Sequence, residues 1–121
     1  AQQETGTATT VFVTPGRQKY HPTASKAWIN FDGTGAGTIN ASHNVASLTV
    51  NGTGDYTVTF TVAFSSANYA YVITAGVSGL TLGLPLLVSQ LAGSLRFTVG
   101  SDTPGAQDST NVNVICFGDQ A

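Results

Sequence analysis

The residues that could perform hydrolysis are few in this chain. A serine or cysteine hydrolase needs a nucleophile, a histidine base and an orienting acid, and the 121 residues include two histidines, His21 and His43. No Gly-x-Ser-x-Gly elbow is present. The single cysteine, Cys116, lies in the apolar run at 114–117, far from both histidines in sequence, which favours a buried structural thiol. We therefore expect no nucleophilic catalysis.

The carboxylates do not indicate a second kind of hydrolysis. A glycosidase needs two carboxyl groups that face each other across a cleft. The aspartates fall in predicted turns or at strand ends, where Asp is a common turn former; they are Asp32, Asp55, Asp102, Asp108 and Asp119. Asp102 and Asp108 share a loop, but their spacing matches no calcium-binding loop. The sequence predicts no enzyme and no cofactor.

A metal ion is conceivable at one position. A single histidine is a poor metal site, but three copies of His21 around a threefold axis could hold a transition metal. The simpler interpretation, which we favour, is that His21 caps or stacks just before Pro22, where the N-terminal segment joins the rest of the chain.

Charged residues make up 8% of the chain, against roughly 25% in ordinary soluble domains. A nucleic-acid footprint needs clustered cations, and Arg17, Lys19, Lys26 and Arg96 cannot form one. The same shortage argues against electrostatic attachment to a membrane. The longest apolar stretch, at 80–88, is too short to cross a bilayer. We expect no nucleic acid and no membrane insertion.

The composition favours strands throughout, because Val, Ile and Thr are abundant while Glu, Lys and Met are nearly absent. Tyr56, Val58, Phe60 and Val62 alternate with threonines, as in a sheet with one buried face. The predicted fold class is all-β: an antiparallel β-sandwich or jelly-roll-like domain at 21–121, after a short extended neck at 1–20. Strands are expected at 27–31, 39–45, 47–50, 55–62, 69–76, 84–90, 94–100 and 111–118, with a hairpin turn at 51–54.

Aromatic and leucine-rich segments leave alternatives open. Trp28 is expected to pack in the core, with a sugar-stacking platform as the alternative. Tyr69 and Tyr71 share a strand face, where half-buried packing is favoured over glycan stacking. The segment GLTLGLPLL at 79–87 is either a kinked core strand or an exposed apolar loop. We favour packing of this segment between subunits.

Several motifs together resemble the C-terminal tip of phage and prophage fibres. The segment ETGTATTVFVTPGRQKYHP at 4–22 resembles a shaft-to-tip junction, and 25–35, 42–60 and 67–72 resemble the domain that follows it. The resemblance covers about residues 3–75, while 76–121 match in strand texture only. The matching junction residues are Glu4, Thr5, Gly6, Thr7, Val13, Thr14, Pro15, Arg17, Gln18, His21 and Pro22.

This resemblance implies a homotrimer on a fibre axis, in a virion protein assembled in the bacterial cytoplasm. A chain with one cysteine, which cannot form an internal disulfide, fits assembly in a reducing compartment. Two functions follow: host attachment through a cell-surface glycan or protein, or a structural trimerisation, capsid-decoration or head-fibre role without receptor specificity. The junction motif argues against a third reading, an ordinary secreted carbohydrate-binding module.

Candidate contact residues follow from this reading. Receptor contacts are expected in the polar loops 32–38, 51–54, 76–83 and 101–110. The candidates are Asn51, Thr53, Leu80, Leu82, Asp102, Gln107 and Asp108. Trimer contacts are expected where apolar residues lack a partner within their own chain: Val11, Phe12, Val13, Tyr20 and Leu84.

Overall fold

The computed structural model describes residues 14–18, 21, 23–76, 82–100 and 105–121. In this part of the chain, one short helix is followed by eight strands. They are α2 (Pro15–Gln18), β1 (Ala27–Asp32), β2 (Thr38–His43), β3 (Val45–Gly52), β4 (Asp55–Phe60), β5 (Ala70–Gly76), β6 (Leu82–Leu91), β7 (Ser94–Gly100) and β8 (Asn111–Phe117). No helix among these residues is long and apolar enough to span a membrane.

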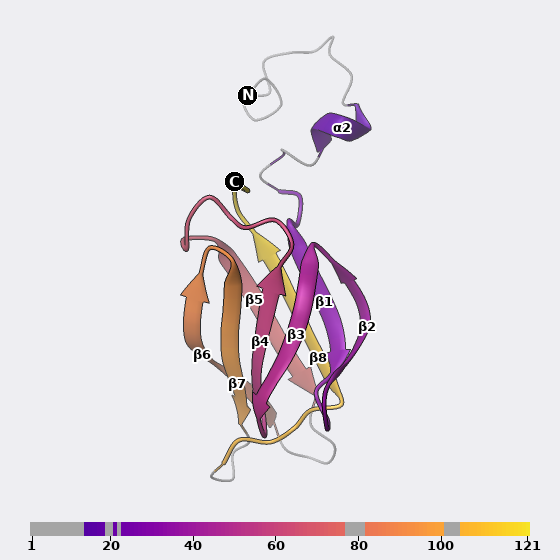
Figure 1. Cartoon of the computed structure of the whole chain (residues 1–121), viewed down its shortest axis with the longest axis vertical. Coiled ribbons are helices and arrows are strands. Elements are labelled where there is room, and N and C mark those ends of the chain that lie inside the picture. Colours follow the sequence, from indigo (N-terminus) through magenta and orange to yellow (C-terminus); the bar gives the residue numbers. More distant parts are fainter. Residues whose placement is uncertain (1–13, 19–20, 22, 77–81, 101–104) are drawn as a thin grey trace.

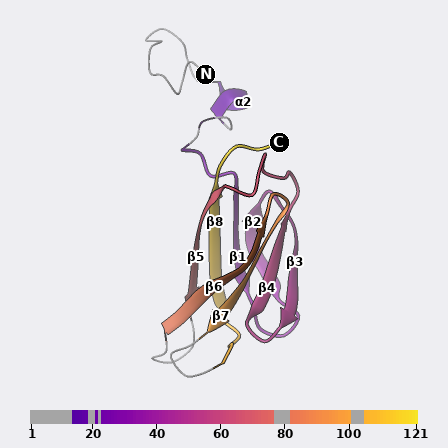
Figure 2. The same ribbon diagram turned by 90° about the vertical axis from the view of Figure 1, so that its left-hand side faces the viewer.

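The strands form one antiparallel sheet in the order β2-β1-β8-β5-β6-β7-β4-β3. The sheet curls into two facing walls and nearly closes into a barrel (Figure 1). β6 joins the walls: it pairs with β5 through Gly83 and Leu82, then diverges and pairs with β7 from Leu84 to Leu91. Figure 2 shows this crossing from the side. The all-β antiparallel prediction is confirmed, but the sheet is continuous through β6 and is not divided into two.

The core lies between the walls and is built from alternate residues of the strands. In β4 the side chains of Tyr56, Val58 and Phe60 are buried while the threonines between them are partly exposed, as the alternation predicts. Phe31 contacts Tyr56 edge to face, with ring centroids 5.1 Å apart. Such pairing adds about 0.5–1.5 kcal/mol to the burial of two aromatic side chains.

Three predictions about strand boundaries and the neck are wrong. Val62 is 45% exposed, because β4 ends at Phe60 and the Val62 amide donates to Asn44 Oδ1 at 2.7 Å. The stretch 39–45 belongs to two strands separated by Asn44, which has φ 55°; asparagine tolerates this left-handed conformation better than most residues. The neck is not extended at Pro15–Gln18, where Pro15 begins a helical turn, a position that suits its fixed φ.

Trp28 also departs from its predicted place. Ala27, Ile29 and Phe31 of β1 point into the core, so Trp28 lies on the outer face and is 37% exposed. Packing in the core is therefore ruled out for this side chain. Tyr69 is buried and Tyr71 packs against the core, which confirms sheet packing for that pair.

Cys116 is buried on β8, as predicted, and burial raises the pKa of its thiol to about 12. At pH 8 only roughly one thiol in ten thousand would be ionised, and the thiolate is the reactive form. We expect the native protein to be unreactive towards Ellman's reagent, and the urea-unfolded chain to react with one thiol per chain. Rapid labelling of native protein would contradict the buried placement.

Candidate functional site

The antiparallel order places four connections at one end of the barrel. Each strand runs opposite to the one before it, so the β1–β2, β3–β4, β5–β6 and β7–β8 connections share an end. The start of β1 and the end of β8 lie at the other end (Figure 1). The four loops predicted for recognition, 32–38, 51–54, 76–83 and 101–110, belong to these four connections. We call this end the four-loop end; of residues 77–81 and 101–104 within it nothing is described.

The Tyr56 hydroxyl is at the centre of a hydrogen-bond network beneath these loops. It lies 3.2 Å from the Gly33 carbonyl and 3.3 Å from Asp108 Oδ1, the two acceptors available to its proton. The hydroxyl also accepts the Ser109 amide at 3.2 Å. Burial raises the pKa of Tyr56 above its usual value, so the hydroxyl remains a donor at neutral pH.

Asp108 and Ser109 extend the network to the other connections. Asp108 Oδ1 accepts the Gly54 amide at 2.8 Å, and the Ser109 carbonyl accepts the Gly33 amide at 2.7 Å. Ser109 Oγ donates to the Gly76 carbonyl at the end of β5. The network therefore links described residues of the β1–β2, β3–β4 and β7–β8 connections with the end of β5, and holds the described parts of this end in one arrangement.

Replacing Tyr56 by phenylalanine is expected to lower the free energy of unfolding by about 1–3 kcal/mol, since buried polar groups lose their partner. Amide exchange at Ser109 should accelerate. Tyr69→Phe is the matched control, because the Tyr69 hydroxyl donates to the Ser94 carbonyl beside the opposite end. Unchanged exchange at Ser109 in Tyr56→Phe, or equal acceleration in Tyr69→Phe, would contradict the proposed role of the network.

The predicted receptor contacts are divided by this geometry. Asn51 and Thr53 are exposed, and Asn51 Nδ2 donates to Thr57 Oγ1 at 2.8 Å. Gln107 and Asp108 are half-buried. The backbone N–H of Gln107 donates to the Val99 carbonyl at 2.9 Å, and Asp108 Oδ1 accepts the backbone N–H of Gly54. These two residues support the loops. Leu80 and Asp102 lie outside the described residues, and Leu82 begins β6.

The predicted trimer contacts are mostly untested. Leu84 lies on β6 with about half of its surface exposed. Val11, Phe12, Val13 and Tyr20 lie outside the described residues. His21 Nδ1 is 2.6 Å from Thr23 Oγ1 and 3.3 Å from the Thr23 amide nitrogen. This local capping fits the simpler interpretation of His21.

The described aspartates occupy turns and an ion pair. Asp32 accepts the side-chain and backbone donors of Thr34, which lowers its pKa. Asp55 pairs with Arg96 at 2.7 Å, and the hydrogen bond lowers the pKa of this carboxyl. Thr34 and Arg96 are the kinds of partner expected for surface carboxylates. Among residues 14–18, 21, 23–76, 82–100 and 105–121, no group of three or more His, Cys, Asp or Glu side chains could hold a metal ion.

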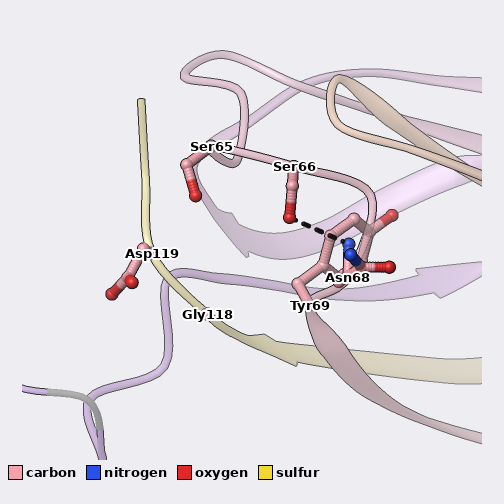
Figure 3. Close-up of a pocket in the computed structure, with 6 residues that line it drawn as sticks. All are labelled: Ser65, Ser66, Asn68, Tyr69, Gly118 and Asp119. Carbon is pink, nitrogen blue, oxygen red and sulfur yellow. Dashed lines mark hydrogen bonds between the residues drawn. The ribbon is translucent and has the colours of Figure 1, made fainter.

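A shallow hollow of about 300 Å³ lies near the chain ends. Figure 3 shows the β4–β5 connection on one side of it and the C-terminal segment on the other. The hollow is lined by Ser65, Ser66, Asn68, Tyr69, Gly118 and Asp119. The backbone N–H of Asn68 donates to Ser66 Oγ within the same loop at 3.2 Å. Asp119 has the only carboxyl group in this lining. The set has no nucleophile–base pair.

The sequence left an exposed apolar segment at 79–87 as one alternative and named Leu84 as a trimer contact, and β6 exposes a run of apolar side chains. Sequence reasoning missed the row of asparagines on β1, β2 and β8 beside Trp28. The alternation Asn111-Val112-Asn113-Val114 is the signal that could have located this row, since it places both amides on one face.

Comparison of the chain with models of protein families, with curated proteins and with solved structures finds no match to any of them.

Proposed function

We propose that this chain is the trimeric tip of a phage fibre and takes part in attachment to the host cell. The observation that carries the proposal is the exposed apolar surface of β6. Leu86 is 66% exposed in a strand that contains no charged residue. The exposed large apolar side chains of β6 are Leu84, Leu86, Leu87, Val88 and Leu91. A group of exposed apolar side chains on one strand marks a contact surface.

The backbone of β6 supports the same proposal. On the β5 side, ladder pairing stops at Gly83, so the described edge from Leu84 to Leu91 has no strand partner there. Pro85 and a register shift between Leu87 and Ser89 interrupt this edge. Such features oppose open-ended strand addition and favour a closed contact between a few subunits.

A second copy of the chain is the partner that suits this surface. β6 contains no charged residue, so two copies can meet there without repulsion between like charges. Closed rotational symmetry would bring each β6 against a neighbour and turn the four-loop ends in one direction. Three weak binding sites on one tip would gain affinity through avidity.

The first test is the mass of the isolated chain in solution at low micromolar concentration, measured by light scattering. We expect about three times the chain mass of 12.4 kDa. A clean monomer would overturn the trimeric proposal.

A competition assay tests attachment. Purified trimer should reduce adsorption of the parent phage to host cells. The Asn51→Ala, Thr53→Ala double variant should keep the mass of the wild type but reduce adsorption less than the wild type does. The structural alternative, a trimerisation or capsid-decoration domain, is favoured by one observation: Asp108 and Gln107 are used within the four-loop end. A stable trimer that never competes for adsorption would favour that alternative.

A further inference from the structure

The outer face of the β2-β1-β8-β5 wall carries two adjacent rows of side chains. In the first row Trp28 lies opposite Ile115, and Ile115 lies opposite Val72. All three are exposed apolar residues. In the second row Asn30 lies opposite Asn113, and Asn113 lies opposite Thr74. An indole is thus next to a row of amides on an open sheet face.

Hydrogen bonds hold the amides in place. Asn30 Nδ2 donates to Asn113 Oδ1 at 2.7 Å and to Asn111 Oδ1 at 2.8 Å. Asn40 Nδ2 donates to Asn30 Oδ1 at 3.0 Å, and Asn113 Nδ2 donates to Asn111 Oδ1 at 3.2 Å. Beyond these bonds Asn30 keeps one acceptor position and Asn111 keeps its two donors, while Asn40 and Asn113 keep capacity of both kinds. The network orients this capacity before any ligand arrives, which reduces the cost of binding.

The spacing suits a six-membered sugar ring. Trp28 and Asn30 are two residues apart on one strand, so their side chains leave the same face about 7 Å apart. A pyranose ring laid on the indole would bury its apolar C–H face and direct hydroxyl groups towards the amides. Aromatic rings and amide side chains are the combination that recognises such a ligand, which is apolar on one face and polar at its edge.

The charge of this face selects among possible ligands. Among the described outward residues of β2, β1, β8 and β5, the acidic and basic side chains are Asp32, which is engaged with Thr34 at the end of β1, and His43, which lies opposite Trp28 on β2. Neither Lys nor Arg is present there to pair with a carboxylate, sulfate or phosphate group on a ligand. The face is therefore complementary to an uncharged ligand.

We infer that this face, around Trp28 and Asn30, binds a neutral pyranose unit of a glycan. The inference deepens the proposed attachment function and rests on it for its biological meaning, but its test is binding by the purified protein. It places the glycan on the side of the barrel and not at the four-loop end. Trp28 and Asn30 lie on β1, three strands or about 14 Å across the sheet from the β6 contact surface, so one assembled tip has room for both contacts.

The test uses the fluorescence of Trp28, the only tryptophan in the chain. The assembled protein is titrated with three neutral polysaccharides, laminarin, dextran and galactomannan, and with the acidic polysaccharide alginate. At least one neutral polymer should change the emission and protect Trp28 from quenching by acrylamide, while alginate should not. If none of the three binds, or if acrylamide cannot reach Trp28 in the assembled protein, the inference is wrong.

Variants locate the binding site by calorimetry. Trp28→Ala should weaken binding of the responding polysaccharide by about tenfold, and Asn30→Leu should weaken it by a similar factor. Asn68→Ala is the matched control, because Asn68 is an exposed asparagine in the β4–β5 connection, away from this face. Weaker binding by Asn68→Ala with normal binding by Trp28→Ala would overturn the inference. Light scattering on the same samples measures the mass of the assembly, so a failure of the trimer proposal is detected separately from a loss of glycan binding.

Discussion

Replacing Gly54 by alanine is expected to lower the free energy of unfolding by about 2–4 kcal/mol. Gly54 has φ 64°, and an added Cβ would lie 2.6 Å from the Val99 carbonyl oxygen and 2.7 Å from the Gln107 nitrogen. The left-handed conformation costs an L-residue about 1–2 kcal/mol, and overpacking costs about 1–3 kcal/mol. The obstructing atoms belong to the backbone, so a rotamer change cannot relieve the clash. Urea unfolding followed by circular dichroism measures the loss.

Gly52→Ala, in the same hairpin, is the matched control. No atom lies within 4 Å of a Cβ built on Gly52, so the change should cost about 0.5 kcal/mol or less. Both variants must be compared at one chain concentration, because association would raise the apparent stability of the folded state. Equal unfolding midpoints for the two variants would show that the close packing of Gly54 against Val99 and Gln107 is wrong.

The double variant Leu84→Ser, Leu86→Ser is expected to dissociate the proposed trimer at low micromolar concentration. Both side chains are at least half exposed in the isolated chain, so their replacement removes little from the core. In an assembly they would be buried, and each buried leucine contributes about 1.5–3 kcal/mol. Light scattering should report the 12.4 kDa chain, with an unchanged far-ultraviolet spectrum.

Ile39→Ser is the control for this result. Ile39 is another exposed apolar residue, but β2 lies four strands from β6 in either direction around the barrel. This variant should keep the mass of the wild type. Dissociation by Ile39→Ser, or an intact trimer in the Leu84→Ser, Leu86→Ser variant, would move the subunit contact away from β6. An intact trimer that no longer competes for host adsorption would assign the β6 surface to the receptor.

The strand positions could be predicted because the responsible patterns are local. The apolar residues of β4 and β7 alternate with polar ones, and the hairpin of β3 and β4 has Gly52 at the end of β3 and Gly54 in its turn. Trp28 was misplaced because its apolar character was weighed without its position in the alternation. Asn30 shares its face, and Ala27, Ile29 and Phe31 share the other. At Trp28 hydrophobicity predicts burial and alternation predicts exposure. The structure follows the alternation, and the exposed side chain is the one of functional interest.

Local sequence was thus sufficient for the all-β class, the approximate positions of the strands and the burial of Cys116, since alternation and turn residues act within a few positions of one another. The tertiary structure decided the rest. β8 inserts between β1 and β5 and brings together side chains that are about 80 positions apart, such as Asn30 and Asn113. The same long-range pairing brings Gly33, Asp108 and Ser109 together around the Tyr56 hydroxyl and leaves the described edge of β6 from Leu84 to Leu91 without a partner on the β5 side. Register between distant strands depends on the packing of the whole core, and no short segment encodes it.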